Sequence, residues 1–207
     1  MRILNVLFMC FVLVVAAGAT PLLVVFNDGG NITNGSQYVG PYDLTLNGNA
    51  ITAVCVSLNQ EVYPGETWQV NADTVADFSQ PDQNKYLQAE WLRQQFPLFA
   101  NDTAGIQQAG WDIFMNPGDP GYFTDSNTLH WLSLAQSNYN SVDPLSFSIL
   151  VPITDSQIPQ SAGQPQTFIT NRVAETPESG TLVEAGTGII LAVLCWRKAR
   201  KVTGNNQ

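Results

Sequence analysis

The chain has 207 residues, of which 44% are hydrophobic and only 12% are charged, about half the charged share of an average globular protein. Between Arg2 and Glu184 there are three basic and sixteen acidic residues, a net charge of −13. A chain this acidic has no surface that neutralises phosphates, which argues against nucleic acid and anionic membrane surfaces as partners of this part of the chain.

Residues 1–19 have the three parts of a secretory signal peptide. Arg2 supplies the positive start, residues 3–16 form an apolar run broken only by Asn5, and residues 17–19 are small, as a cleavage site requires. The alternative, an uncleaved anchor, fits less well because the run is short for a membrane span. We therefore expect export, a mature chain that begins near Thr20, and an exported body over residues 20–174.

The first part of the body has the pattern of antiparallel strands. The expected strands cover residues 21–26, 42–46, 50–58 and 61–70. Asn47-Gly48-Asn49 separates the second strand from the third, and an Asn-Gly pair suits the positive φ angles of a tight hairpin turn. The sequence therefore predicts a hairpin centred on Gly48.

The hydrophobic period changes to that of helices between about residues 82 and 139. The first expected helix begins at Pro81-Asp82 and ends before Pro97, and its apolar residues lie three and four positions apart. The second is capped by Asn101-Asp102-Thr103 and the third by Asp125-Ser126. The expected apolar positions are Leu87, Trp91, Leu92 and Phe96 in the first helix, Ile106, Gly110, Ile113 and Phe114 in the second, and Leu129, Trp131, Leu132 and Leu134 in the third.

Strands return over residues 145–153 and 166–170, joined by a polar loop at 156–166. Strands on both sides of a helical segment predict an α+β body. Its expected architecture is a mainly antiparallel β-sandwich or barrel with a helical insertion of about three helices.

The last thirty residues combine three features in order. Pro177-Glu178 precedes an apolar stretch at 182–196, and a basic cluster follows it. The members of this cluster are Arg197, Lys198, Arg200 and Lys201. At ~1.5 Å per residue the apolar stretch reaches only about 22 Å, less than a hydrocarbon core of ~30 Å. One interpretation of residues 182–196 is an ordinary single-pass membrane anchor, and the other is a sorting signal.

This order resembles the PEP-CTERM sorting signal of Gram-negative bacteria, although Ser179 stands where the family has its second proline. The resemblance implies that residues 175–201 are a sorting signal read by an exosortase-type enzyme, after passage through the export machinery. Residues 182–196 would be a transmembrane segment that anchors the chain at least transiently in the inner membrane, and residues 202–207 a polar tail.

Residues for conventional catalysis are scarce in the body. It contains one histidine, His130, and one cysteine, Cys55. Neither a metal-ligand cluster nor a Gly-x-Ser-x-Gly motif is present, so we predict no conventional catalytic set, no metal and no cofactor. We interpret His130, beside Trp131, as a polar position on a helix.

Cys55 lies between Val54 and Val56 on an expected strand. One interpretation is a small buried apolar residue. A lone cysteine in an oxidising compartment has no partner for an internal disulfide, so the other interpretation is that its thiol is used chemically.

About fifty residues after Cys55, the expected second helix carries Gln107, Ala109 and Trp111. A strand cysteine followed by a helical Gln-x-Ala-x-Trp, with a tryptophan-bearing helix at Trp91 between them, resembles the thioester domains of bacterial surface proteins. Many PEP-CTERM proteins carry a similar arrangement.

The resemblance implies that the thiolate of Cys55 attacks the side-chain amide of Gln107 and that ammonia leaves. The product is an internal thioester, which traps amines on a target. Trp111 shares the helix face of Gln107 and would shield the bond from water, and Trp91 would pack nearby.

Two positions depart from the family pattern. Ser57 stands where the family has an acid, two residues after the cysteine, and Gly110 stands where it has a branched apolar residue. A glycine inside a helix costs ~1 kcal/mol, but it permits close approach to a neighbouring strand.

The sequence thus predicts a protein of the cell envelope or the extracellular space, which attaches to extracellular polymer or to an amine-bearing surface target. Two alternatives stay open. One is a structural protein of the envelope or biofilm matrix without covalent chemistry. The other is a cysteine hydrolase that uses Cys55 and His130.

Overall fold

A computed structural model describes residues 21–30, 32–35, 37–153 and 165–173, and these form one compact unit within 21–173. The predicted signal peptide, most of the 156–166 loop and the whole sorting signal, with its motif residues and transmembrane segment, lie outside the described residues. Among the residues described, no helix is long and apolar enough to cross a membrane.

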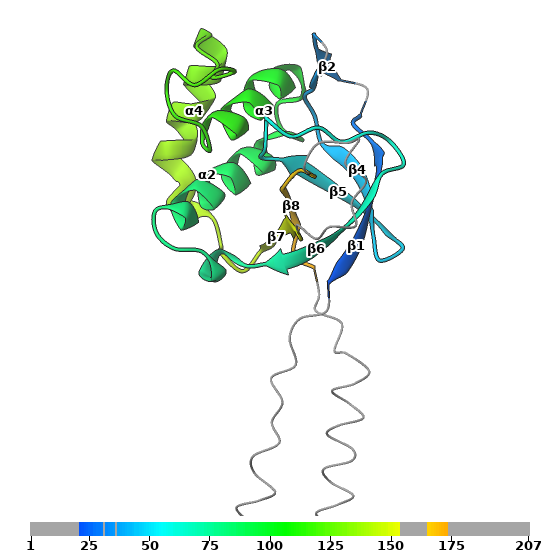
Figure 1. Cartoon of the computed structure of the whole chain (residues 1–207). Helices are drawn as coiled ribbons and strands as arrows, with labels where there is room; N and C mark the ends of the chain where they lie inside the picture. The colour runs from blue at the N-terminus through cyan, green and yellow to red at the C-terminus, as the bar shows by residue number, and fades with distance from the viewer. Residues whose placement is uncertain (1–20, 31, 36, 154–164, 174–207) are drawn as a thin grey trace, which may run out of the picture. The chain divides into compact units, whose positions relative to one another are not determined.

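Six antiparallel strands form a closed barrel (Figure 1). The strands are β1 (Leu22–Asp28), β4 (Tyr42–Leu46), β5 (Asn49–Cys55), β6 (Thr67–Asp73), β7 (Phe147–Pro152) and β8 (Phe168–Asn171), and a separate small hairpin consists of β2 (Thr33–Asn34) and β3 (Gln37–Tyr38). Around the barrel the order is β1-β4-β5-β8-β7-β6, with β6 paired to β1. The sequence had left sandwich and barrel open; a barrel leaves no strand edge of its sheet unpaired.

The predicted hairpin joins β4 to β5. Asn47 and Gly48 have φ angles of 47° and 83°, and Leu46 pairs with Asn49 across the turn. The Asn47 side chain also accepts a hydrogen bond from the backbone N–H of Leu23 at 2.7 Å, which holds the turn against β1.

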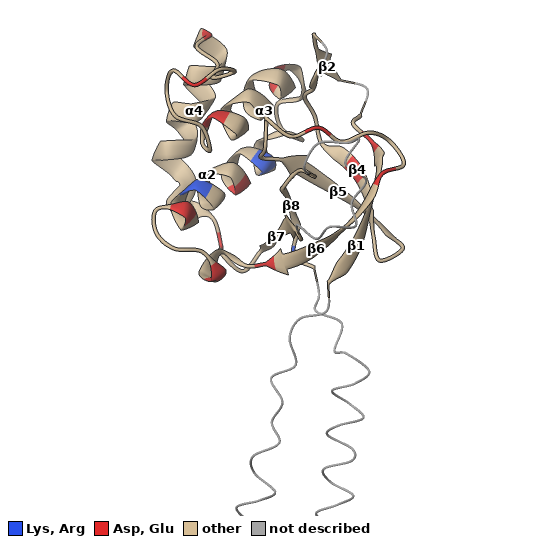
Figure 2. Ribbon diagram, in the orientation of Figure 1, with Lys and Arg blue, Asp and Glu red and all other residues tan. Residues whose placement is uncertain are grey.

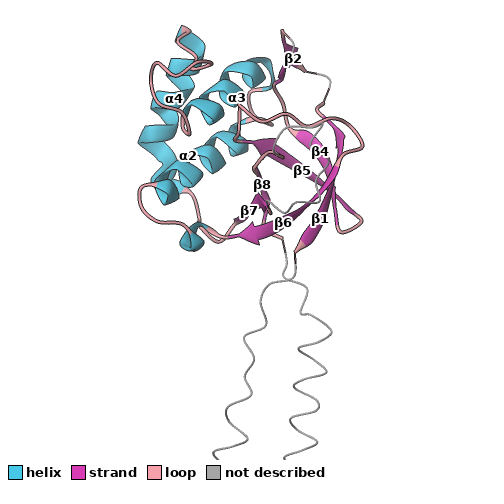
Figure 3. Ribbon diagram, viewed as in Figure 1, coloured by secondary structure: helices cyan, strands magenta, loops and turns pink. Residues whose placement is uncertain are grey.

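Three helices form a layer on one side of the barrel (Figure 3). They are α2 (Asp82–Gln95), α3 (Thr103–Asp112) and α4 (Ser126–Asn138). The predicted insertion at 82–139 is therefore confirmed in position and in helix number. Asp125 caps α4 as expected, since its carboxylate accepts the backbone N–H groups of Asn127 and Thr128 at 3.1 and 3.0 Å. Asp102 precedes α3, but its side chain makes no capping bond.

The strands alternate between two clusters of buried side chains. On β5, Ala53 and Cys55 belong to the barrel core, whereas Val54, and Val56 just after the strand, belong to the helical core outside the barrel. The barrel core comprises Val24, Phe26, Val39, Tyr42, Leu44, Leu46, Ala53, Cys55, Trp68, Val70, Trp111, Leu150 and Phe168. Trp111 comes from α3, and Ala104 of the same helix packs against this core, so α3 contributes side chains to it.

Two expectations about these elements were wrong. The strand at 50–58 ends at Cys55, because the chain turns there and the backbone N–H of Ser57 bonds back to the Cys55 sulfur. Leu129, expected on the buried face of its helix, is 43% exposed. Buried positions of α4 are Thr128, Trp131 and Ala135, which lie three and four residues apart, and Leu129 falls outside that face.

The two glycines of α3 have different surroundings, so we expect their replacement by alanine to have opposite effects on the free energy of unfolding. A Cβ at Gly110 has nothing within 4 Å outside its own helix, whereas a Cβ at Gly105 would overlap Asn127 Nδ2 and lie 3.2 Å from Trp131 Cδ1. We expect Gly110→Ala to raise the free energy of unfolding by about 1 kcal/mol through helix propensity. Gly105→Ala should lower it by about 1 kcal/mol through overpacking. Urea unfolding of both variants checks this, and equal effects would contradict the packing described for α3.

Candidate functional site

Cys55 is the last residue of β5, and its side chain is fully buried in the barrel core. The backbone N–H of Ser57 lies 3.3 Å from the sulfur, and the thiol lies 3.4 Å from the Ser57 carbonyl oxygen. The Ser57 hydroxyl instead accepts the backbone N–H of Thr167 at 3.2 Å. Ser57 therefore contacts the sulfur through its backbone, and its side chain supplies no acid.

Burial raises the pKa of the Cys55 thiol to about 12, while the Ser57 backbone and the Trp111 indole act in the opposite direction. Desolvation disfavours the thiolate, so the sulfur carries a proton at neutral pH. Any nucleophilic step at this sulfur must therefore move that proton.

Gln107 lies on α3 and is also fully buried. Its side-chain nitrogen Nε2 donates a hydrogen bond to the backbone carbonyl oxygen of Cys55 at 2.7 Å, across 52 positions of sequence. Its side-chain oxygen Oε1 is buried without a hydrogen-bond partner. The fold thus places the amide of Gln107 directly beside the cysteine residue.

The neighbouring glutamine has a different surrounding. Gln108 Oε1 accepts a hydrogen bond from the Thr128 hydroxyl at 3.0 Å, so this side chain is directed at α4. Helix geometry turns consecutive residues by about 100°, which separates the two amides. Of the pair, Gln107 is the one directed at Cys55.

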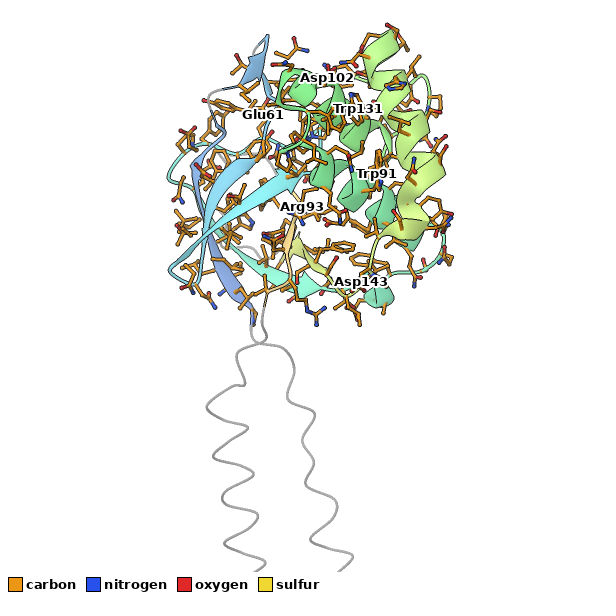
Figure 4. The ribbon with its side chains drawn as sticks, turned by 180° about the vertical axis from the view of Figure 1, so that it is seen from behind. Glu61, Trp91, Arg93, Asp102, Trp131 and Asp143 are labelled. Carbon is orange, nitrogen blue, oxygen red and sulfur yellow. The ribbon has the colours of Figure 1, made fainter. Side chains whose placement is uncertain are left out.

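Trp111, predicted to shield the site, and Trp91, predicted to pack near it, lie in different cores. Trp111 is 3% exposed in the barrel core with Cys55, and its ring stacks on Phe123 at a centroid distance of 6.0 Å. Trp91 packs against Trp131 in the helical layer, at 6.4 Å (Figure 4). The structure therefore brings Trp111, and not Trp91, into the cluster that holds the cysteine.

His130 is exposed on α4, and its ring lies edge-on against Trp131. It belongs to the helical layer, whereas the sulfur of Cys55 points into the barrel. The structure places no hydrogen bond between the two residues, and the geometry gives no support to a Cys55–His130 hydrolase.

The segment after α3 is held over Trp111 by Asp112. Both carboxylate oxygens of Asp112 accept the backbone N–H of Phe123, at 3.1 and 3.3 Å, and Phe123 stacks on Trp111. Burial raises the pKa of Asp112 to about 6, with a further contribution from the charge of Asp125, although the N–H of Phe123 opposes it.

The raised pKa of Asp112 predicts a pH dependence of stability. A carboxyl group whose pKa is higher in the folded chain than its ordinary value of 3.8 favours folding most when it is protonated. This contribution is complete below pH 3.8 and is lost as the pH rises through about 6. The thermal midpoint of the parent should therefore fall over this window relative to that of Asp112→Asn, whose amide oxygen still accepts the N–H. A pH-independent difference between the two would contradict the prediction.

A buried ion pair on α2 was not predicted from the sequence. Glu90 is 0% exposed and forms a two-point contact with Arg93, whose Nη2 also donates to Asn171 Oδ1 on β8 at 2.9 Å. Gln94 donates a further hydrogen bond to Glu90 at 2.9 Å. The spacing of Glu90 and Arg93, three residues apart on a helix, is compatible with an ion pair, but nothing in the sequence shows that it is buried.

Arg93 also borders a cavity of about 350 Å³ between β5 and the helices. Most of its other lining residues are apolar, and they come from β5, the segment between α2 and α3, and two positions before β4, Ile32 and Pro41. Among the described residues, no group of three or more His, Cys, Asp or Glu residues is placed to hold a metal ion.

Comparison with models of known protein families gave no match, and neither the curated proteins nor the solved structures gave a significant one. The function of this chain therefore has to be inferred from the geometry of Cys55, Gln107 and Trp111.

The arrangement has the parts that an acyl transfer requires. A thiol and a carboxamide lie in adjacent buried positions, on a strand and a helix that are both fixed by packing. Groups held together in this way react as if at a very high concentration, provided that the reacting atoms reach bonding distance. Burial also excludes water, which would hydrolyse a thioester.

Proposed function

We propose that this is an exported cell-surface or matrix protein of a Gram-negative bacterium that attaches to its targets through an internal thioester between Cys55 and Gln107. The observation that carries the proposal is the 2.7 Å hydrogen bond from Gln107 Nε2 to the carbonyl oxygen of Cys55. Residues 175–201 supply the sorting function in this proposal, through an exosortase-type enzyme.

The chemistry is balanced without a further reactant. The Cys55 sulfur bonds to the side-chain carbon Cδ of Gln107, the Cδ–Nε2 bond breaks, and the thiol proton leaves with the nitrogen as ammonia. A primary amine on a target then attacks the same carbon, forms an amide with residue 107 and returns the thiol. Each molecule reacts once with its target, so the protein is a covalent anchor and not an enzyme that turns over.

The charge of the body favours particular targets. Acidic residues are spread over the helices, the barrel and the loops, and few basic residues accompany them (Figure 2). Amines on a neutral or basic polymer or surface approach such a body without repulsion, whereas anionic polymers are repelled.

A structural protein without covalent chemistry is the second candidate. The observation that favours it is the complete burial of Cys55, which raises the pKa of its thiol to about 12. In this case Cys55 is a small apolar residue of the barrel core, and Gln107 is a structural hydrogen-bond donor between α3 and β5.

Labelling with a primary amine tests the proposal. The purified chain is incubated with a biotin-linked alkylamine, and the modified residue is located by peptide mass spectrometry. We expect one label, at Gln107, in the parent and none in Cys55→Ala. Failure of the folded parent to take up the amine, together with a titratable thiol at Cys55, would overturn the covalent function and leave the structural one.

A further inference from the structure

Two buried polar atoms beside Cys55 have no hydrogen-bond partner. They are the side-chain oxygen Oε1 of Gln107 and the indole nitrogen Nε1 of Trp111. The first residue is 0% exposed and the second 3%. A buried donor and a buried acceptor that both stay unpaired cost free energy, and so each of them calls for an explanation.

Both atoms belong to one face of α3. Trp111 follows Gln107 by four residues, so the two side chains are neighbours along the helix. Trp111 belongs to the barrel core together with Cys55, and its indole N–H is directed toward the Cys55 sulfur, where it acts to lower the pKa of the thiol. The indole N–H of Trp111 therefore faces the Cys55 sulfur without forming a hydrogen bond of normal geometry, and it lies on the same helix face as the Gln107 amide.

We propose that the indole N–H of Trp111 donates a hydrogen bond to Gln107 Oε1 during thioester formation and stabilises the oxyanion at that atom. This inference rests on the proposed thioester and assigns Trp111 a chemical role beyond packing. Trp111 is then a catalytic residue of the bond-forming step, since it contacts a reacting atom.

During this step negative charge develops on Gln107 Oε1, the atom to which the indole N–H of Trp111 would donate. As the sulfur bonds to Cδ of Gln107, the electron pair of the carbonyl double bond moves to Oε1. Collapse of this intermediate restores the carbonyl and breaks the Cδ–Nε2 bond, and the thiol proton leaves with ammonia. The indole keeps its own proton, and the same donor serves the attack of an amine, which passes through a similar oxyanion.

The lack of a hydrogen-bond acceptor does not by itself distinguish Trp111 from the other buried tryptophans. Trp68 and Trp131 also have buried indole nitrogens without partners. Trp131 lies in the helical core, away from the cysteine, and Trp68 lies in the barrel core, where its ring stacks on Phe168 at 6.2 Å. Position beside Gln107 sets Trp111 apart, and Trp68 is the matched control.

The experiment compares Trp111→Phe with Trp68→Phe in the full chain. Both variants lose one indole N–H and keep an aromatic ring in the barrel core. Incubation with ammonium converts any thioester back to the free thiol and the amide, and removal of ammonium then starts thioester formation. Intact mass against time follows the loss of one ammonia. Removing one oxyanion donor slows a comparable reaction by about 10²–10³-fold, so we expect a slowing of about 10²-fold in Trp111→Phe and little change in Trp68→Phe.

The outcomes separate this inference from the function on which it rests. If the parent itself never loses ammonia, the thioester proposal fails and this inference fails with it. If the parent loses ammonia and the two variants do so equally fast, the inference alone is overturned.

Should Trp111→Phe fail to fold, the parent still gives a test by nuclear magnetic resonance. The same donor should bond the carbonyl oxygen of the finished thioester, so the indole proton resonance of Trp111 should move downfield as ammonium is removed. Indole resonances that all stay in place would overturn the inference.

Discussion

Replacing Arg93 with methionine is expected to lower the free energy of unfolding by about 3–5 kcal/mol. The substitution leaves the Glu90 carboxylate, which is 0% exposed, without its counter-charge, and it also removes the bond from α2 to Asn171 on β8. The size of the effect comes from the uncompensated buried charge more than from the lost attraction. Urea unfolding monitored by tryptophan fluorescence measures it.

The same helix offers a matched control. Lys85 and Asp82 are also three residues apart on α2, at 3.4 Å, but their side chains are 38% and 48% exposed. Exposed pairs contribute between about 0 and 1 kcal/mol, so Lys85→Met should have a small effect. The double variant Glu90→Gln/Arg93→Met should recover much of the loss, because it removes the buried charge. A small effect of Arg93→Met would contradict the buried ion pair.

Replacing Gln107 with alanine is expected to abolish amine capture completely. The variant has no carboxamide at position 107 to form the thioester, and the carbonyl oxygen of Cys55 loses its 2.7 Å donor. Loss of a partner for a buried group costs about 1–3 kcal/mol, so the variant should also be less stable.

Gln108→Ala separates the chemical effect from the structural one. It removes a buried amide from the same helix and breaks the bond to Thr128, with a comparable cost in stability. Because Gln108 is directed at α4, capture of a biotin-linked amine should persist in this variant. Loss of capture in both variants would show that the measurement follows the integrity of the helix and not the thioester.

Local chemistry made several elements predictable from the sequence. An Asn-Gly pair needs no distant contact to adopt positive φ angles, and the carboxylate of Asp125 caps α4 from within its own turn. The helical period over 82–139 likewise follows from neighbouring residues. Elements of this kind depend on interactions over a few positions, which a sequence displays directly.

Long-range packing decided what the sequence left open. Closure of the barrel depends on β5 pairing with β8, as Ala53 does with Thr170, across more than a hundred positions. The exposure of Leu129 and the burial of Glu90 depend on which helix face meets a neighbour. Hydrophobic character alone gave the wrong answer for the first and no answer for the second.

The candidate site was likewise predictable from the sequence only in part. The spacing of Cys55, Gln107 and Trp111 came from the sequence through a family resemblance, whereas Trp91 was assigned to the site although it packs elsewhere. The unpaired atoms of Gln107 and Trp111 could not have been predicted, since a missing hydrogen bond depends on every neighbour of the atom.

The first measurement for the Cys55–Gln107 thioester is the intact mass of the natively purified chain, with Cys55→Ala measured in parallel after the same processing by the host. If the thioester forms, the parent is lighter than its calculated mass by one ammonia, the variant has its full mass, and methylamine adds its own mass to the parent alone. A parent of full mass with a titratable thiol at Cys55 would contradict it.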